Sequence, residues 1–157
     1  MLAFGDSITN GGGELQWGVA LQSWSMWVAR ALGLPFTNYA QDGARVEDVV
    51  GCQIPALERR SAVPGTRFHL GCLYIGVNDV RASDWHARSF EVNFRSALDY
   101  LTLRSDRVLT VTAPLDLGRP RAGVKVQELN AIVDATAQEL GALVLDLRHF
   151  GARNHVM

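Results

Sequence analysis

The sequence has only two cysteines, Cys52 and Cys72, and no excess of charge of either sign. Two cysteines cannot build the disulfide framework of a small secreted domain or a four-cysteine zinc site, although a single bridge between them remains an alternative to two free thiols. Fifteen Lys and Arg residues stand against sixteen Asp and Glu residues, which gives a formal net charge of −1. This balance argues against nucleic acid as the main partner.

Long hydrophobic runs are also missing. No apolar run reaches the roughly 18–20 residues that a membrane span requires. No charged segment followed by an apolar one marks a secretory signal at the start of the sequence. We therefore expect a protein without a membrane span that is located in the cytoplasm.

Three familiar sequence motifs are absent, and each absence narrows the function. Neither G-x-G-x-x-G nor the Walker sequence occurs, so nucleotide or phosphate binding at the glycine run 11–13 is only a minor alternative. The G-x-S-x-G motif is missing as well, which excludes the common nucleophile elbow of the α/β-hydrolases.

The 157 residues suffice for one globular domain with a core. Hydrophobic residues make up 48% and charged residues 20%, which excludes a disordered or collagen-like chain. The first strand pattern starts at residue 1, and only residues 148–157 follow the last one. We therefore expect residues 1–157 to form a single domain that is truncated at both ends and lacks its C-terminal helix.

Short apolar runs alternate with helical patterns along the whole chain. Strands are predicted at 1–4, 36–40, 68–75, 108–113 and 142–147, and helices at 24–32, 46–60, 90–101 and 126–140, with an interruption at Pro55. This alternation predicts a parallel sheet with helices on both faces. In such a fold, ligands bind at the carboxyl ends of the strands.

Polar residues follow each of the first three predicted strands. Ser7 comes after the first strand, Gly43 after the second and Asn78 after the third. Each of them, taken alone, also fits an ordinary turn. Because all three lie at the same edge of a parallel sheet, we expect a hydroxyl, a main-chain N–H and a side-chain amide to converge there. Such a set is typical of an acyl-transfer site.

These segments resemble the conserved blocks of the GDSL, or SGNH, hydrolases. Gly5-Asp6-Ser7-Ile8-Thr9 is similar to the first block, Gly43 to the glycine of the second, and Gly76-Val77-Asn78-Asp79 to the third. The resemblance implies a flavodoxin-like three-layer α/β/α sandwich with a five-stranded parallel sheet in the order 2-1-3-4-5. It also implies hydrolysis of carboxylic esters without a metal or an organic cofactor.

The resemblance also implies roles for individual residues. Ser7 would be the nucleophile, and the N–H groups of Ser7 and Gly43 would form the oxyanion hole with the Asn78 side chain. Asp6 and Asp79 would stabilise the turns of the first and third blocks without touching the substrate. Trp17 is a further candidate to line an acyl pocket.

The family's fourth block, Asp-x-x-His, supplies the catalytic base. Asp146 and His149 have the required spacing, although Asp146 falls inside or at the end of the fifth predicted strand. The alternatives are His155 and a histidine beyond residue 157. We expect a serine esterase or lipase that cleaves a small-molecule ester through an acyl-enzyme. The alternative is a catalytically incomplete module that binds an acyl or glycan ligand. The substrate and the oligomeric state stay open.

Overall fold

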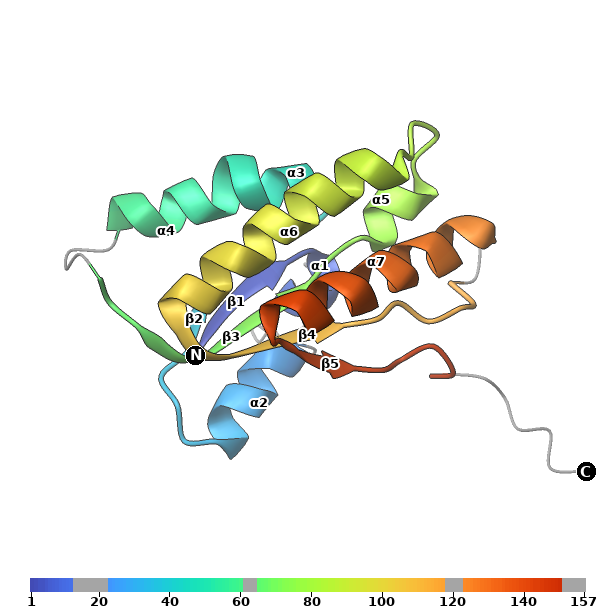
Figure 1. The fold of residues 1–157 in the computed structure, drawn as a ribbon. Helices are drawn as coiled ribbons and strands as arrows, with labels where there is room; N and C mark the ends of the chain where they lie inside the picture. Colours follow the sequence, from blue (N-terminus) through green and yellow to red (C-terminus); the bar gives the residue numbers. More distant parts are fainter. Residues whose placement is uncertain (13–22, 61–64, 118–122, 151–157) are drawn as a thin grey trace, which may run out of the picture.

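The computed structural model describes residues 1–12, 23–60, 65–117 and 123–150. It contains a sheet of five parallel strands in the order β2-β1-β3-β4-β5 (Figure 1). The strands are β1 (Leu2–Gly5), β2 (Thr37–Asn38), β3 (Phe68–Tyr74), β4 (Ser105–Val111) and β5 (Leu143–Leu145). The predicted strands and their order are confirmed.

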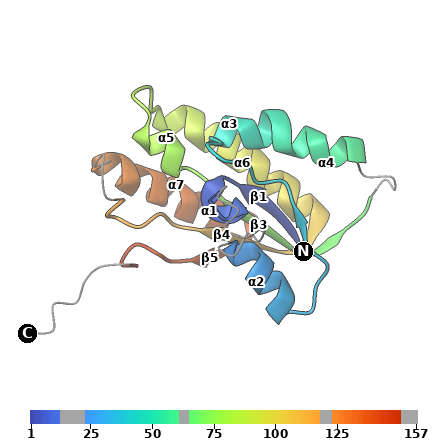
Figure 2. The same ribbon diagram turned by 180° about the vertical axis from the view of Figure 1, so that it is seen from behind.

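Helices cover both faces of the sheet. They are α1 (Ser7–Asn10), α2 (Trp24–Ala31), α3 (Val46–Asp48), α4 (Ile54–Arg60), α5 (Val77–Arg81), α6 (Ala87–Arg104) and α7 (Val124–Leu140). In Figures 1 and 2, α3, α4, α6 and α7 lie on one side of the sheet and α2 lies on the other. This arrangement confirms the predicted three-layer sandwich.

The central strand β1 is buried on both faces. Leu2 and Phe4 belong to the core on the α6 and α7 side, whereas Ala3 packs in a smaller core with Ala29 of α2. All three β1 side chains are fully buried. Such burial explains why the first strand is a continuous apolar run rather than an alternating one.

Residues 46–60 form a continuous helical stretch whose irregularity differs from the predicted one. The sequence predicted an interruption at Pro55, but a π-helical turn, η1 (Val49–Gln53), lies just before that residue and joins α3 to α4. The Ile54 N–H donates to the Val49 carbonyl, five residues earlier. Pro55 has no N–H for the helix ladder, and the turn before it takes the wider geometry. The turn leaves Gln53 buried.

The last strand is the most exposed part of the sheet. Leu143, Val144 and Leu145 are 52%, 38% and 46% exposed. Within the described residues, only a turn follows β5, at 148–150. No helix in the described part of the chain is long and apolar enough to cross a membrane.

Candidate active site

The chain turns sharply from β1 into α1, and Ser7 is the first residue of this helix. Asp6 caps the helix, since its carboxylate accepts a hydrogen bond of 2.9 Å from the Ile8 N–H. Gly5 has a φ of 156°, and a Cβ there would lie 2.4 Å from Thr9 Oγ1. The close packing at Gly5 fixes the turn, and the half-buried Ser7 stands at the carboxyl edge of the sheet.

The loop after β2 is tied to this turn by two hydrogen bonds. The Gln41 N–H donates to the Gly5 carbonyl at 3.1 Å, and Asn10 Nδ2 donates to Asp42 Oδ1 at 3.1 Å. Gly43, the next residue, is exposed and has a φ of +76°, a conformation that favours glycine. Among the residues that the structure describes, no acceptor takes the N–H of Gly43 or of Ser7. The described part of the chain therefore uses neither donor.

Asn78 links the third block to the second. It lies in the short helix α5, where the sequence predicted only a turn. Its Nδ2 atom donates a hydrogen bond of 2.9 Å to the Ala44 carbonyl. A carboxamide nitrogen carries two N–H donors, so one stays available beside the exposed Gly43 loop. Hydrogen bonds thus join the segments of Ser7, Gly43 and Asn78, which the sequence predicted to lie at one edge of the sheet.

Two buried carboxyl groups stabilise the segments that carry Ser7 and Asn78. Asp6 is 1% exposed and Asp79 is 4% exposed. Both Asp79 oxygens accept the Val46 N–H at 3.2 Å, so Asp79 ties its own block to the start of α3. Burial raises the pKa of each group to about 6, and the charge of Asp79 adds to the rise for Asp6. These buried carboxyl groups thus accept hydrogen bonds from the main chain, Asp6 from Ile8 and Asp79 from Val46.

These raised pKa values predict a pH-dependent stability. The folded protein holds these two protons more tightly than the unfolded chain, where the pKa is near 3.8. We therefore expect the free energy of unfolding to fall between pH 4 and 6.5, by on the order of 2 kcal/mol for each of the two groups. Urea titrations of Asp79→Asn should show a shallower fall, and Asp99→Asn on the exposed face of α6 should match the wild type. Equal slopes for all three proteins would contradict the assignment.

The structure, which describes all three residues, shows no hydrogen bond between Ser7 and either Asp146 or His149. Asp146 follows β5, and its Oδ1 accepts hydrogen bonds from Thr112 Oγ1 at 3.0 Å and from the Arg148 N–H at 2.9 Å. The Arg148 N–H is the main cause of a lowered pKa for Asp146. His149 is exposed, and among the described residues no histidine is hydrogen-bonded to Ser7 or to Asp146. The catalytic pairing of Asp146 with His149 stays a prediction.

Ser7 lines a cavity together with residues of the turn and helix that follow it. A cavity of about 280 Å³ is lined by Ser7, Ile8, Gly11 and Gly12. Trp17 and His155, two of the predicted candidates, lie outside the described residues. No group of three or more His, Cys, Asp or Glu side chains in the described ranges could hold a metal ion.

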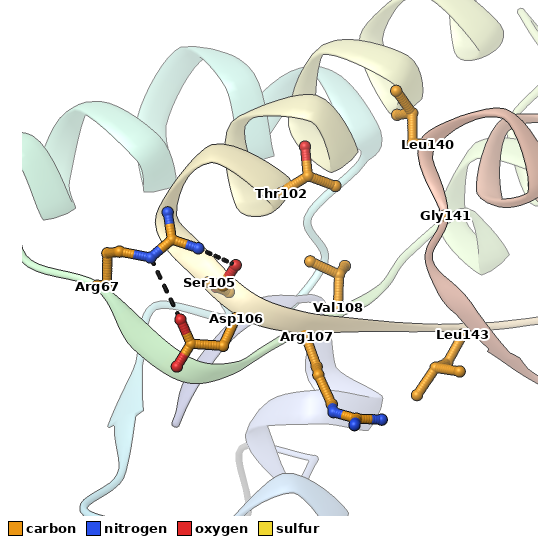
Figure 3. A pocket seen from close by; sticks show the side chains of 9 residues that line it. All are labelled: Arg67, Thr102, Ser105, Asp106, Arg107, Val108, Leu140, Gly141 and Leu143. Carbon is orange, nitrogen blue, oxygen red and sulfur yellow. Dashed lines mark hydrogen bonds and ion pairs between the residues drawn. The ribbon is translucent and has the colours of Figure 1, made fainter.

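A second cavity, of about 320 Å³, lies elsewhere (Figure 3). It is lined by residues at the amino ends of β4 and β5, opposite the edge that carries Ser7. Its Arg67 donates to Asp106 Oδ1 at 3.2 Å and to the Ser105 carbonyl at 2.8 Å. Because Arg67 serves to hold the start of β4 in place, we assign this cavity to the fold and not to the active site.

Sequence reasoning missed Gln53, whose carboxamide is bonded to Gly5. A signal was present, because Gln53 occupies a position in the apolar stripe formed by Val46, Val49 and Leu57. A polar residue on the buried face of a helix requires hydrogen-bond partners.

Comparison with known families decides the relationship. The family model described as the GDSL-like lipase/acylhydrolase family matches residues 3–156. The chain belongs to this family. It is therefore a hydrolase of carboxylic esters, and the match includes all three blocks described above. A search of curated protein sequences found no significant match.

Solved structures share the fold at low sequence identity. The acetylxylan esterase Axe2 from Geobacillus stearothermophilus is 20% identical with a TM-score of 0.68, and the alignment covers 94% of this chain and 75% of that one. LAE5, an alpha/beta hydrolase from the metagenome of Lake Arreo, is 18% identical with a TM-score of 0.69 and coverages of 94% and 76%. A GDSL-family lipolytic protein from Veillonella parvula is 22% identical with a TM-score of 0.68, and the alignment covers 93% of this chain and 76% of that one. Two further matches are catalytic mutants of Axe2 with alanine in place of a serine or a histidine.

Proposed function

We propose that Ser7 is the nucleophile of an esterase that works through an acyl-enzyme. The Ser7 hydroxyl attacks the ester carbonyl and loses its proton to a base, and the carbonyl oxygen becomes an oxyanion. Collapse of this intermediate releases the alcohol, which takes the proton from the base. Water, activated by the same base, then releases the acid and restores the hydroxyl of Ser7.

The observation that carries this proposal is the open hydrogen-bond donors around Ser7. The N–H groups of Ser7 and Gly43 have no acceptor among the described residues, and Asn78 keeps one N–H beyond its bond to Ala44. Unpaired donors at fixed positions are what a developing oxyanion requires. In the proposal, all three donate to the carbonyl oxygen as its negative charge forms.

The base in this proposal is a histidine outside the described residues. Asp146 supports this assignment, because its carboxylate accepts from Thr112 and from both the main chain and the side chain of Arg148. These contacts take three of the roughly four acceptor positions of the carboxylate, which leaves it little capacity to orient His149. His155 and any continuation of the chain beyond residue 157 are the candidates that remain.

An acetyl ester is the substrate class that we propose to assay first. One structural neighbour is an acetylxylan esterase, and its catalytic mutants replace a serine and a histidine. Ile8 is the one large apolar side chain among the described residues that line the cavity at Ser7. Against these described residues, a long acyl chain would therefore bury little apolar surface.

A fluorophosphonate probe tests the nucleophile and the base together. We expect intact-protein mass spectrometry to show one adduct on the 157-residue chain, and the rate of labelling to be unchanged within about twofold in His149→Ala. Loss of labelling in His149→Ala would make His149 the base, contrary to the proposal. A wild-type chain that is unlabelled and does not turn over p-nitrophenyl acetate would exclude His155 as the base. The same result with a chain extended past residue 157 would favour the alternative, a catalytically incomplete module that binds an acyl or glycan ligand.

A further inference from the structure

Gln53 is a fully buried polar side chain that contacts the main chain beside the nucleophile. It is 0% exposed and ends the π-helical turn η1. The Gly5 N–H donates to Gln53 Oε1 at 3.0 Å, and Gln53 Nε2 donates to the Gly5 carbonyl at 2.8 Å. These two bonds join residues 48 positions apart in the sequence. The Gln53 carboxamide is thus bonded to both the N–H and the carbonyl of Gly5.

Gly5 is the residue from which the first two blocks are positioned. Ser7 follows it by two residues, through the helix cap at Asp6. The Gly5 carbonyl also accepts the Gln41 N–H at 3.1 Å, and Gln41 lies in the loop that contains Gly43. A rotation of the Gly5 peptide would therefore shift the Ser7 hydroxyl relative to the Gly43 N–H.

The π-helical turn places Gln53 for this contact. Val49 and Gln53 are buried within the turn, whereas Gly51 and Cys52 between them are exposed. The bond from the Ile54 N–H to the Val49 carbonyl spans five residues and widens the helix at this point. Turns of this kind are uncommon inside helices and are frequent at functional sites.

We propose that Gln53 is a positioning residue, which holds the Gly5 peptide and through it fixes the distance between Ser7 and the Gly43 N–H. This inference rests on the proposed function of Ser7. Gln53 contacts no substrate in this account, and its effect reaches the reaction through the orientation of the Gly5 peptide. Small displacements of a nucleophile slow the chemical step more than they weaken substrate binding.

The fold supplies a matched control in Asn130 of α7. The Ala113 N–H donates to Asn130 Oδ1 at 2.8 Å, and Asn130 Nδ2 donates to the Ala113 carbonyl at 2.9 Å. Asn130 is 2% exposed, so its two bonds are as buried as those of Gln53. Loss of either carboxamide should therefore cost similar stability, and only one of them is bonded to the turn of the nucleophile.

Gln53→Glu and Asn130→Asp test the inference through a pH profile. A protonated carboxyl can donate a hydrogen bond to the main-chain carbonyl that accepted from the original amide. An ionised carboxylate cannot donate, and its negative oxygen repels that carbonyl oxygen. We expect the kcat of Gln53→Glu for p-nitrophenyl acetate, relative to wild type, to fall about 10- to 100-fold as the new carboxyl ionises, with KM changed less than about threefold. Asn130→Asp should keep a kcat ratio that does not vary with pH.

Gln53→Met and Asn130→Leu remove both hydrogen bonds at each site and provide the second comparison. Circular dichroism gives the folded fraction, to which each kcat is normalised. Folded Gln53→Met should lose kcat by at least about tenfold, and Asn130→Leu should stay within about threefold of wild type. A flat kcat ratio for Gln53→Glu, or equal losses at both sites, overturns the role of Gln53. Full activity in Ser7→Ala would instead overturn the proposed function, so the two failures are distinguishable.

Discussion

Ser7→Ala should abolish ester hydrolysis while leaving the fold intact. We expect kcat for p-nitrophenyl acetate to fall by about 10⁴-fold or more, because no other group replaces the attacking oxygen. Within the described residues the Ser7 side chain makes no hydrogen bond, so its removal breaks none of the contacts that hold the turn. The melting temperature should therefore change little, and steady-state kinetics together with thermal unfolding checks both expectations.

Ser105→Ala is the matched control for this experiment. The Ser105 hydroxyl is buried without a hydrogen-bond partner among the described residues, and it lies at the start of β4, opposite the edge that carries Ser7. Its loss should leave kcat within about twofold of wild type. If Ser7→Ala kept activity comparable to that of Ser105→Ala, the nucleophile would have to be assigned elsewhere.

Asn78→Ala should cause the second largest loss of activity. One carboxamide donor would be removed from the oxyanion, and a single donor of this kind is typically worth about 10²–10³ in kcat. KM should change much less, because the interaction strengthens as charge develops in the transition state. Part of the effect passes through the bond to the Ala44 carbonyl, which the substitution also removes. Kinetics at substrate concentrations above and below KM separate the two constants.

Asn93→Ala controls for that lost main-chain contact. Asn93 is half-buried on α6, and its Nδ2 donates to the Ser89 carbonyl at 3.1 Å, much as Asn78 donates to Ala44. We expect Asn93→Ala to keep full activity. A kcat for Asn78→Ala within about threefold of Asn93→Ala would remove Asn78 from the oxyanion hole.

Local sequence patterns were sufficient for the fold and for the first three blocks. The apolar run before Ser7 predicted a strand, and the structure shows that this strand, β1, is covered on both faces. The residues of the three blocks could be placed together because each one follows a parallel strand. That inference requires parallel strands, which the alternation of elements predicts, and the strand order follows from the family resemblance.

Features that depend on distant contacts were not predictable in the same way. The bond between Gln53 and Gly5 joins positions 48 residues apart, and a local pattern shows only a polar residue within an apolar stripe. The helix α5 is short, and Gly76 before it has a φ of 118°. A Cβ at this position would lie 2.4 Å from Leu129 Cδ1 of the distant helix α7. The spacing of Asp146 and His149 made them one candidate pair, and the hydrogen bond from Thr112 of another segment to the Asp146 carboxylate could not be predicted from that spacing.

A crystal structure of the phosphonylated protein tests the central claim most directly. The phosphoryl oxygen stands where the oxyanion would form. We predict that phosphorus is bonded to Ser7 Oγ, and that this oxygen lies about 3 Å from the Gly43 nitrogen and from Asn78 Nδ2. An adduct on another residue, or a phosphoryl oxygen that contacts neither Gly43 nor Asn78, would contradict the account.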